Sequence, residues 1–232
     1  SFVNEIASIC EALGADVAEV SRGMGMDVRI GGQFLKAGLG WGGSCFPKDV
    51  KALAHMAAIH GAHPQLLRSV MDINSDQRLR TVAKLRHALG ALEGQRVAIL
   101  GAAFKANTDD TRNSPALELA QLLLLEGAAV AIHDPVVPSA RISALVPGAE
   151  VAGSPEAAVA RATALVVATE WPEFVRLDLA RLGETMSRRL LVDARNLFDP
   201  LAARSAGFEY RCIGRPAAEG GALAPAVAGV AP

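Results

Sequence analysis

Apolar residues recur at helical spacing along residues 1–90, and this part of the chain contains no clear strand pattern. We expect four helices there, at 1–14, 15–24, 47–61 and 64–90. The last would be about 40 Å long at about 1.5 Å per residue, a length that suggests an interface element. Asn74 and Gln77 interrupt its apolar face, so both side chains should need polar partners within the fold.

After Gly94, short aliphatic runs alternate with amphipathic stretches, a pattern typical of a parallel α/β sheet. Strands are expected at 96–100, 128–134, 162–169, 189–195 and 208–214, and helices at 115–126, 138–145, 154–161 and 174–186. The predicted fold class is α/β: an all-helical region, then a Rossmann-like doubly wound parallel sheet domain with its ligand site at the carboxyl ends of the strands. The expected divisions are a helical region at 1–92, the sheet domain at 93–215 and a disordered tail at 216–232.

The composition indicates a folded chain, with 232 residues of which 51% are hydrophobic and 20% charged. A formal net charge of −1 with both signs dispersed argues against nucleic acid and anionic membranes as partners. We expect a cytoplasmic protein without disulfides, because the cysteines, at 10, 45 and 212, are odd in number and no apolar run is long enough to span a membrane. Helical periodicity from the first residue, with no start methionine and no cap, suggests a fragment of a longer protein.

The stretch GLGWGGSCFPKD, residues 38–49, places Cys45 between a glycine-rich loop and a predicted helix. With Pro47 as its first residue, this helix would direct its positive end at the sulfur, and Lys48 would add positive charge, so both would favour the reactive thiolate. Asp49 could hold a water or a proton near the sulfur. The glycines would let backbone amides approach a sugar or a phosphate. A buried, unreactive cysteine after a flexible hinge is the alternative.

The first strand of the sheet domain leads into GAAFKANTDDTR, which lacks the G-x-G-x-x-G of a dinucleotide-binding turn. Lys105 and Arg112 follow this strand and Arg195 follows a later one, so three cations would converge at the carboxyl edge and suit a phosphate. Ion pairs with Asp109 and Asp110 on a solvated loop are an equally open alternative. Three histidines near residue 60 lack the spacing of a metal site, and no metal is predicted.

Several segments together resemble the UDP-glucose 6-dehydrogenase family of nucleotide-sugar dehydrogenases. In chain order they are NEIASICEALGADV, FLKAGLGWGGSCFPKD, NSDQR, VAILGAAFKANTDDTRNSPALELA and HDPVV, and the resemblance covers roughly residues 1–215. It implies oxidation of UDP-glucose to UDP-glucuronate with NAD as cofactor, through a cysteine-bound thiohemiacetal and a thioester that water hydrolyses. It also implies a homodimer formed through the 64–90 helix.

By the same resemblance, Cys45 matches the nucleophile, Asp49 an acid that positions or activates water, and Asn4 a residue that hydrogen-bonds the oxyanion region. Cofactor contacts are implied for Lys48, near the nicotinamide, and for Arg112, at the NAD pyrophosphate. The implied substrate contacts are Arg29, which would serve the neighbouring subunit's site, and Phe34, Lys36, Gly38, Gly40, Phe104, Lys105 and Arg195.

Two departures from the family pattern stand out. Trp41 occupies a position where the family usually has Tyr or Phe. The family's N-terminal NAD-binding domain, and a catalytic lysine two residues before Ser1, are absent from these 232 residues, so we expect the chain alone to be inactive. The alternatives are a GDP-mannose 6-dehydrogenase, and a non-catalytic UDP-sugar-binding or dimerisation fragment.

Overall fold

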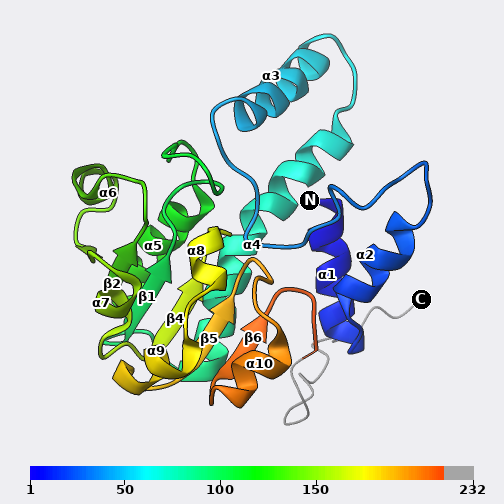
Figure 1. The fold of residues 1–232 in the computed structure, drawn as a ribbon. Helices are drawn as coiled ribbons and strands as arrows, with labels where there is room; N and C mark the ends of the chain where they lie inside the picture. Colours follow the sequence, from blue (N-terminus) through cyan, green and yellow to red (C-terminus); the bar gives the residue numbers. More distant parts are fainter. Residues whose placement is uncertain (217–232) are drawn as a thin grey trace.

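A computed structural model describes residues 1–216. Its first part is helical, with α1 (Phe2–Leu13), α2 (Val17–Gly25), α3 (Phe46–Ile59) and α4 (Gln65–Leu89). Helix α3 extends away from the body beside the start of α4, and α4 then runs down to the sheet (Figure 1). The sequence accounts for the early boundaries, because Gly14 ends α1 with φ 71° and the Asp16 side chain caps the start of α2.

The second part is a six-stranded sheet whose strands are all parallel. The strands are β1 (Arg96–Leu100), β2 (Ala129–His133), β3 (Glu150–Val151), β4 (Ala164–Val167), β5 (Leu190–Asp193) and β6 (Glu209–Cys212). Their order, β3-β2-β1-β4-β5-β6, reverses direction between β1 and β4, and this reversal is the switch point of a doubly wound fold. The predicted fold class is therefore confirmed.

Helices cover the sheet on both sides (Figure 1). The helices of this part are α5 (Pro115–Leu125), α6 (Ser139–Leu145), α7 (Pro155–Val159), α8 (Pro172–Val175), α9 (Leu179–Thr185) and α10 (Pro200–Ser205). Helix α4 packs against α5 and β5, whereas α7 packs against β1, β2 and α9. Leu39, Val82 and Leu85 from the helical part belong to the same buried cluster as the strands, so the two parts share one core.

Some predicted elements differ from the structure. The single helix expected at 174–186 is wrong: α8 and α9 are separate, and Asp178 caps α9 by accepting a hydrogen bond from the Arg181 amide. The two-residue strand β3 and the short helix α10 were not predicted, because neither is long enough to show a periodic pattern. Of the tail predicted to be disordered at 216–232, residues 217–232 lie outside the described part of the chain.

A small second core joins α1 and α2 to the end of β6. It consists of Val3, Ala7, Cys10, Val17, Ala37 and Ile213. Gly214, with φ 73°, lies so close to α1 and α2 that a Cβ there would be 2.5 Å from the Ala7 Cβ and 2.6 Å from Val17 Cγ1. The Val17 amide donates to the Gly214 carbonyl at 2.7 Å, so the turn after β6 fixes the first two helices to the sheet domain.

Candidate functional site

The cysteine loop, residues 38–45, lies across the carboxyl edge of the sheet. The Leu39 amide donates to the Ala194 carbonyl at the end of β5, and the Gly43 amide donates to the Arg112 carbonyl in the loop after β1, both at 2.8 Å. The Asn113 side-chain amide completes this connection by donating to the Gly43 carbonyl at 3.0 Å. The loop that leads to Cys45 is thus held by the same edge at which doubly wound domains bind their ligands.

The glycines of this loop make room for the protein's own groups. Gly40 has φ 115°, and a Cβ there would lie 2.6 Å from the Asn74 side-chain oxygen. Gly43 has φ 92°, and its Cβ would lie 3.0 Å from the Phe104 ring. The amides of Gly38, Leu39, Trp41 and Gly43 all donate within the protein. These bonds commit the amides of Gly38 and Gly43 within the protein, so of the four glycines they leave only the amides of Gly40 and Gly42 for the predicted cradle.

Helices α1 and α4 hold the other side of the cysteine loop. Asn4 is buried, and its side-chain oxygen accepts the Gly38 amide at 2.8 Å. Asn74 pairs with Trp41 through both backbone groups, at 2.8 and 3.1 Å, and so finds the partner that its place in α4 requires. The Trp41 indole N–H donates to the Ser1 hydroxyl at 3.1 Å, a bond that a phenylalanine in its place would not form.

Cys45 is exposed and is the residue immediately before α3. The helix begins at Phe46, one residue earlier than expected, so Pro47 is its second residue. Both Lys48 and Asp49 are largely solvent-exposed, and their charged groups lie 3.5 Å apart. The structure thus presents a thiol to solvent at a helix N-terminus, with a cation and a carboxylate on the first turn.

Arg195 is enclosed between the cysteine loop and the ends of β4 and β5. Its Nε donates to the Ala168 carbonyl at 2.7 Å and its Nη1 to the Gly40 carbonyl at 3.1 Å, and the Glu170 carboxylate lies 3.3 Å from Nε. Nη2 is buried without a hydrogen-bond partner among the described residues. Burial lowers the pKa of this guanidinium, and the charges of Glu170 and Asp193 oppose that shift.

Lys105 and Arg112, the other two members of the predicted phosphate-binding cluster, face solvent. Lys105 lies over the Phe104 ring, with its ammonium 5.4 Å from the ring centre. Arg112 pairs with Asp110 at 2.8 Å, and this hydrogen bond, with a smaller contribution from Cys45, raises the pKa of the arginine. The Arg112–Asp110 pair is one of the ion pairs expected if this loop is simply solvated.

Arg29, Phe34 and Lys36 lie in the segment between α2 and the cysteine loop, and all three side chains are exposed. Arg29 contacts Asp27 at 2.6 Å, while 93% of the Phe34 surface is open to solvent. Within this chain none of the three takes part in the contacts that hold Cys45.

Asp134, which follows β2, joins several segments at this edge of the sheet, and the sequence pattern did not predict a role for it. Its carboxylate accepts the amides of Ala102 and Ala103 at 2.7 and 3.0 Å and the Trp171 indole N–H at 3.1 Å. Burial opposes its ionisation, but backbone hydrogen bonds outweigh that effect and hold the pKa of Asp134 below its usual value. The HDP sequence after an aliphatic strand was the available indication.

These contacts decide whether the sheet can hold a dinucleotide. In a dinucleotide-binding fold the turn after β1 presents free amides to a pyrophosphate, and an acid after β2 binds a ribose. Here one Asp134 oxygen, Oδ2, accepts the amides of both Ala102 and Ala103 in that turn. The residues present therefore do not fit a dinucleotide at the switch point of this sheet.

Comparison with known proteins gives this edge its context. Residues 1–76 match the model of the UDP-glucose/GDP-mannose dehydrogenase family, central domain, and residues 98–200 match the same family's UDP binding domain. The chain belongs to the UDP-glucose/GDP-mannose dehydrogenase family. The cysteine loop is thus part of the dehydrogenase central domain, and the strand ends that hold it belong to the UDP binding domain.

Relatives of this chain include UDP-glucose 6-dehydrogenases from Rhizobium meliloti (45% identity over 93% of this chain and 49% of the relative) and Bacillus subtilis (40% over 95% and 48%). Among solved structures, a UDP-glucose dehydrogenase from Pyrobaculum islandicum shares 35% identity and a TM-score of 0.80, over 90% of this chain and 46% of that one. The chain spans about half the length of the curated relatives it matches.

Between residues 1 and 216, no group of three or more His, Cys, Asp or Glu side chains is placed to hold a metal ion. In the same part of the chain, no helix combines the length and apolar character needed to cross a membrane.

Proposed function

We propose that this chain carries the nucleophile and the UDP-sugar-binding domain of an NAD-dependent UDP-glucose 6-dehydrogenase, which oxidises UDP-glucose to UDP-glucuronate. One observation supports this most directly: an exposed cysteine lies at the start of α3, on a loop hydrogen-bonded to the carboxyl edge of a UDP binding domain. The relatives' names support UDP-glucose as the substrate. The unpaired state of all three cysteines agrees with a cytoplasmic location.

In this proposal Cys45 performs the covalent chemistry. The C6 alcohol of the sugar would first lose a hydride to NAD and its hydroxyl proton, which gives an aldehyde. The Cys45 thiolate adds to the aldehyde carbon and the oxygen takes up a proton, which gives a thiohemiacetal. Loss of a second hydride and of the hydroxyl proton gives the thioester, and water attacks its carbonyl and releases the carboxylate and the thiol. Asp49, on the first turn of α3, takes a proton from that water. Asn4 has its oxygen committed to the Gly38 amide, so its side-chain N–H₂ is the group left to donate to the oxyanion.

The nucleotide would lie at the strand ends beside the cysteine loop. Arg195 supports this placement, because its buried Nη2 lacks an acceptor, which costs about 1–3 kcal/mol until one is supplied. Phe104 and Lys105 provide an aromatic face and a solvent-facing ammonium from the loop after β1. Gly38 and Gly40 fix the loop against Arg195 and Asn74, and we propose that they act by this close packing.

The two hydride transfers of the proposed reaction need NAD, which accepts a hydride at each oxidation. The sheet described here does not fit a dinucleotide, so we propose that NAD is bound by another part of the whole protein. Lys48 and Arg112, both exposed near Cys45, would then contact its nicotinamide and its pyrophosphate from this side. We propose that Arg29, Phe34 and Lys36 contribute to the substrate site of a neighbouring subunit.

Calorimetry with UDP, UDP-glucose, GDP and GDP-mannose tests the nucleotide assignment on the 232-residue chain. UDP and UDP-glucose should bind at least about tenfold more tightly than the guanine nucleotides, a difference of about 1.4 kcal/mol. Lys105→Gln should weaken this binding, whereas Lys51→Gln on the exposed side of α3 should not. A preference for GDP-mannose would support the alternative dehydrogenase, and binding of neither nucleotide would contradict the assignment.

The catalytic part of the proposal is tested by turnover. The purified chain mixed with UDP-glucose and NAD should form no NADH, because the described residues make no dinucleotide site. Measurable UDP-glucose-dependent NADH formation would contradict this. UDP binding together with an equal rate of Cys45 alkylation with and without UDP-glucose would favour the non-catalytic binding fragment.

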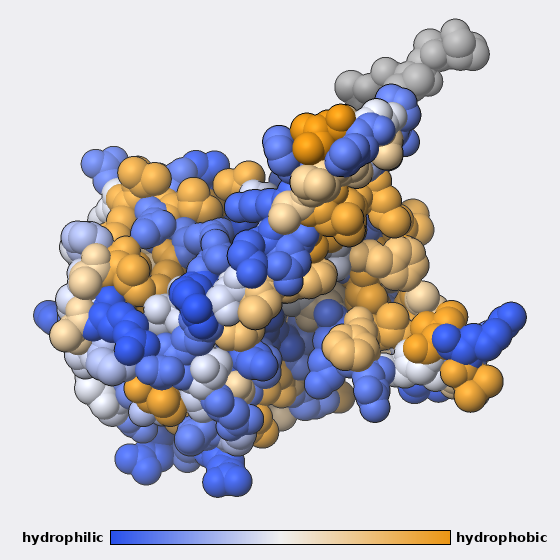
Figure 2. Space-filling view, turned by 90° about the horizontal axis from the view of Figure 1, so that it is seen from above, coloured by the Kyte–Doolittle hydropathy of each residue, from blue (hydrophilic) through white to orange (hydrophobic). Residues whose placement is uncertain are grey.

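We also propose a homodimer formed through α4. Most exposed large hydrophobic side chains lie between Phe2 and Leu79, and hydrophobic patches are visible on the face shown in Figure 2. On α4 itself, Leu66 and Leu79 are 76% and 54% exposed. Sedimentation at micromolar concentration should show a dimer that Leu79→Glu weakens; a monomer would contradict this interface.

A further inference from the structure

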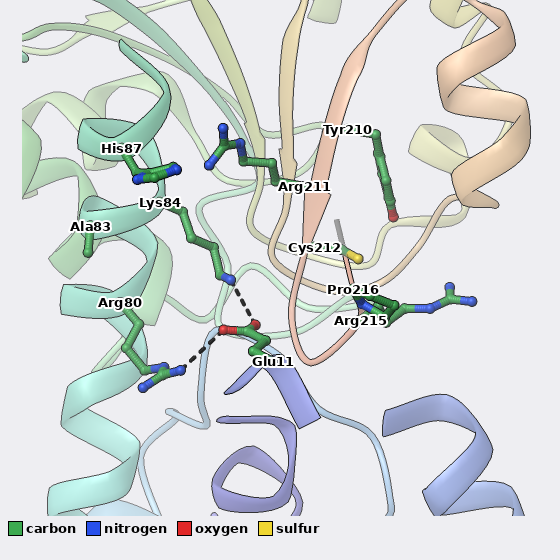
Figure 3. A pocket seen from close by; sticks show the side chains of 10 residues that line it. All are labelled: Glu11, Arg80, Ala83, Lys84, His87, Tyr210, Arg211, Cys212, Arg215 and Pro216. Carbon is green, nitrogen blue, oxygen red and sulfur yellow. Dashed lines mark hydrogen bonds and ion pairs between the residues drawn. The ribbon is translucent and has the colours of Figure 1, made fainter. Parts of the chain in front are cut away.

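Away from the cysteine loop, a hollow of about 230 Å³ lies between α4 and the edge strand β6 (Figure 3). One wall is formed by Arg80, Ala83, Lys84 and His87 on successive turns of α4, and the opposite wall by β6 and the residues that follow it. Glu11 of α1 lies between the two walls. None of the residues that line this hollow belongs to the cysteine loop or to its contacts described above, so this is a separate site.

The hollow carries more positive than negative charge. Glu11 accepts hydrogen bonds from Lys84 at 2.7 Å and from Arg80 at 3.1 Å, so one carboxylate serves two cations. Its oxygen that faces Lys84 also accepts the Gly214 amide at 2.7 Å. The side chains of Glu11 and Lys84 are only 14% and 18% exposed, so water screens this imbalance weakly.

The opposite wall adds two more cations. Arg215 pairs with Asp16 at 3.0 Å, and Arg211 pairs with Glu209 at 2.6 Å. Glu209 also forms an ion pair with Arg188, at 2.8 Å, so its charge neutralises Arg211 only in part. Four basic side chains therefore line the hollow, and the three acids that face them leave a surplus of at least one positive charge.

The surface between these charges is mainly apolar. Ala83, Cys212 and Pro216 line it, together with the Tyr210 ring and the aliphatic stems of the long cations. Burial raises the pKa of Cys212 to about 12, so this thiol stays neutral and contributes apolar surface. A ligand that satisfies such a site needs a compact apolar body and one negative charge.

We propose that the hollow between α4 and β6 binds a small organic monoanion, a carboxylate on an aromatic or aliphatic body. The carboxylate lies among Arg80, Lys84 and Arg211, and the body lies against Ala83 and Cys212. Arg80 and Lys84 would hold the ligand while paired with Glu11 on α1, the helix that also holds the cysteine loop through Asn4. This proposal does not depend on the function assigned to Cys45.

Three probes of graded chemistry test it by calorimetry on the full chain: 2-naphthoate, the neutral isostere 2-naphthylmethanol, and acetate. The naphthoate should bind with a Kd on the order of 1 mM or tighter, and both other probes at least about tenfold more weakly, because each lacks either the charge or the body. UDP affinity should be the same with and without naphthoate, which separates this site from the nucleotide site.

Two variants locate the binding. Ala83→Phe fills the hollow and should weaken naphthoate binding at least about tenfold, whereas Leu125→Phe, at an exposed position of α5 outside the hollow, should change it less than about twofold. Arg211→Gln should weaken it about fivefold, and Arg86→Gln, an exposed arginine of α4 that does not line the hollow, should leave it unchanged.

Circular dichroism confirms the fold of each variant, and Arg211→Gln keeps the test decisive if Ala83→Phe unfolds the chain. The proposal is overturned if naphthoate does not bind saturably, if the neutral isostere binds equally well, or if neither Ala83→Phe nor Arg211→Gln weakens binding relative to its control.

Discussion

Gly214 offers the sharpest test of how the helical part is fixed to the sheet domain. Its φ of 73° is nearly identical to the 71° of Gly14, which ends α1. The two glycines differ in their surroundings. A Cβ on Gly14 would meet no atom within 4 Å, whereas a Cβ on Gly214 would lie 2.5 Å from the Ala7 Cβ and 2.8 Å from the Ala7 Cα. Substitution by alanine at both positions therefore separates backbone strain from packing.

The expected magnitudes follow from these two effects. Alanine in the left-handed region costs about 1 kcal/mol, and this cost is common to both variants. Gly214→Ala adds overpacking against α1 and α2, worth about 1 to 3 kcal/mol, because the atoms that it meets belong to packed helices. At roughly 2 to 4 °C per kcal/mol for a chain of this size, Gly214→Ala should melt about 2 to 12 °C below Gly14→Ala.

Thermal and urea unfolding of both variants measure the difference, with circular dichroism and the fluorescence of Trp41 and Trp171 as independent probes. Trp41 reports on the cysteine loop and Trp171 on the sheet domain. We expect the Trp41 transition to move further in Gly214→Ala, because α1 holds that tryptophan through Ser1. Equal destabilisation of the two variants would refute the reasoning, since the contact with Ala7 would then carry no energetic weight.

Three further predictions concern the edge of the sheet. Gly42→Ala places a methyl group against the Asn113 backbone, 3.0 Å from its carbonyl carbon, and should lower the free energy of unfolding in urea by about 1 to 3 kcal/mol. Gly32→Ala is the control, because open space surrounds that position, and should cost less than about 0.5 kcal/mol. Because the pKa of Asp134 is lowered in the fold, its contribution to the free energy of unfolding is present above the unfolded pKa of about 3.9 and is lost as the pH falls through the folded pKa. Asp134→Asn should therefore cost about 3 kcal/mol at neutral pH and make stability less dependent on pH in acid. Asp76→Asn, on the exposed side of α4, should do neither. Titration with a thiol reagent should find Cys45 alone reactive in the native chain and three thiols in denaturant, and fast native reaction of more than one thiol would contradict the burial of the other two.

Local pattern was sufficient for the elements that are long or strongly periodic. Helix α4 was expected at 64–90 and spans Gln65–Leu89, and β1 was predicted at the observed residues, Arg96–Leu100. Prediction failed where the chain makes short elements. Helices α8 and α9 were merged because the intervening residues continue an amphipathic pattern, and the Asp178 cap interrupts it.

In the candidate site, the sequence predicted individual residues but not the partners that they find in the fold. The sequence predicted that Asn74 needed a polar partner, but it could not identify Trp41, because the two residues are brought together by the path of the loop between α2 and α3. The predicted convergence of three cations depends on how the strand ends lie in space. The structure encloses Arg195 behind Gly40 and leaves Lys105 and Arg112 facing solvent.

The sequence by itself determined the α/β class, the cysteine at a helix start and the family, because these depend on periodicity and on motifs within short segments. Only the tertiary structure decided what packs against the glycines of the cysteine loop. Gly40 lies against Asn74 and Gly43 against Phe104, and both partners are distant in sequence. Close approach of distant segments is a property of packing, so it becomes visible only when the helical part and the sheet domain are placed together.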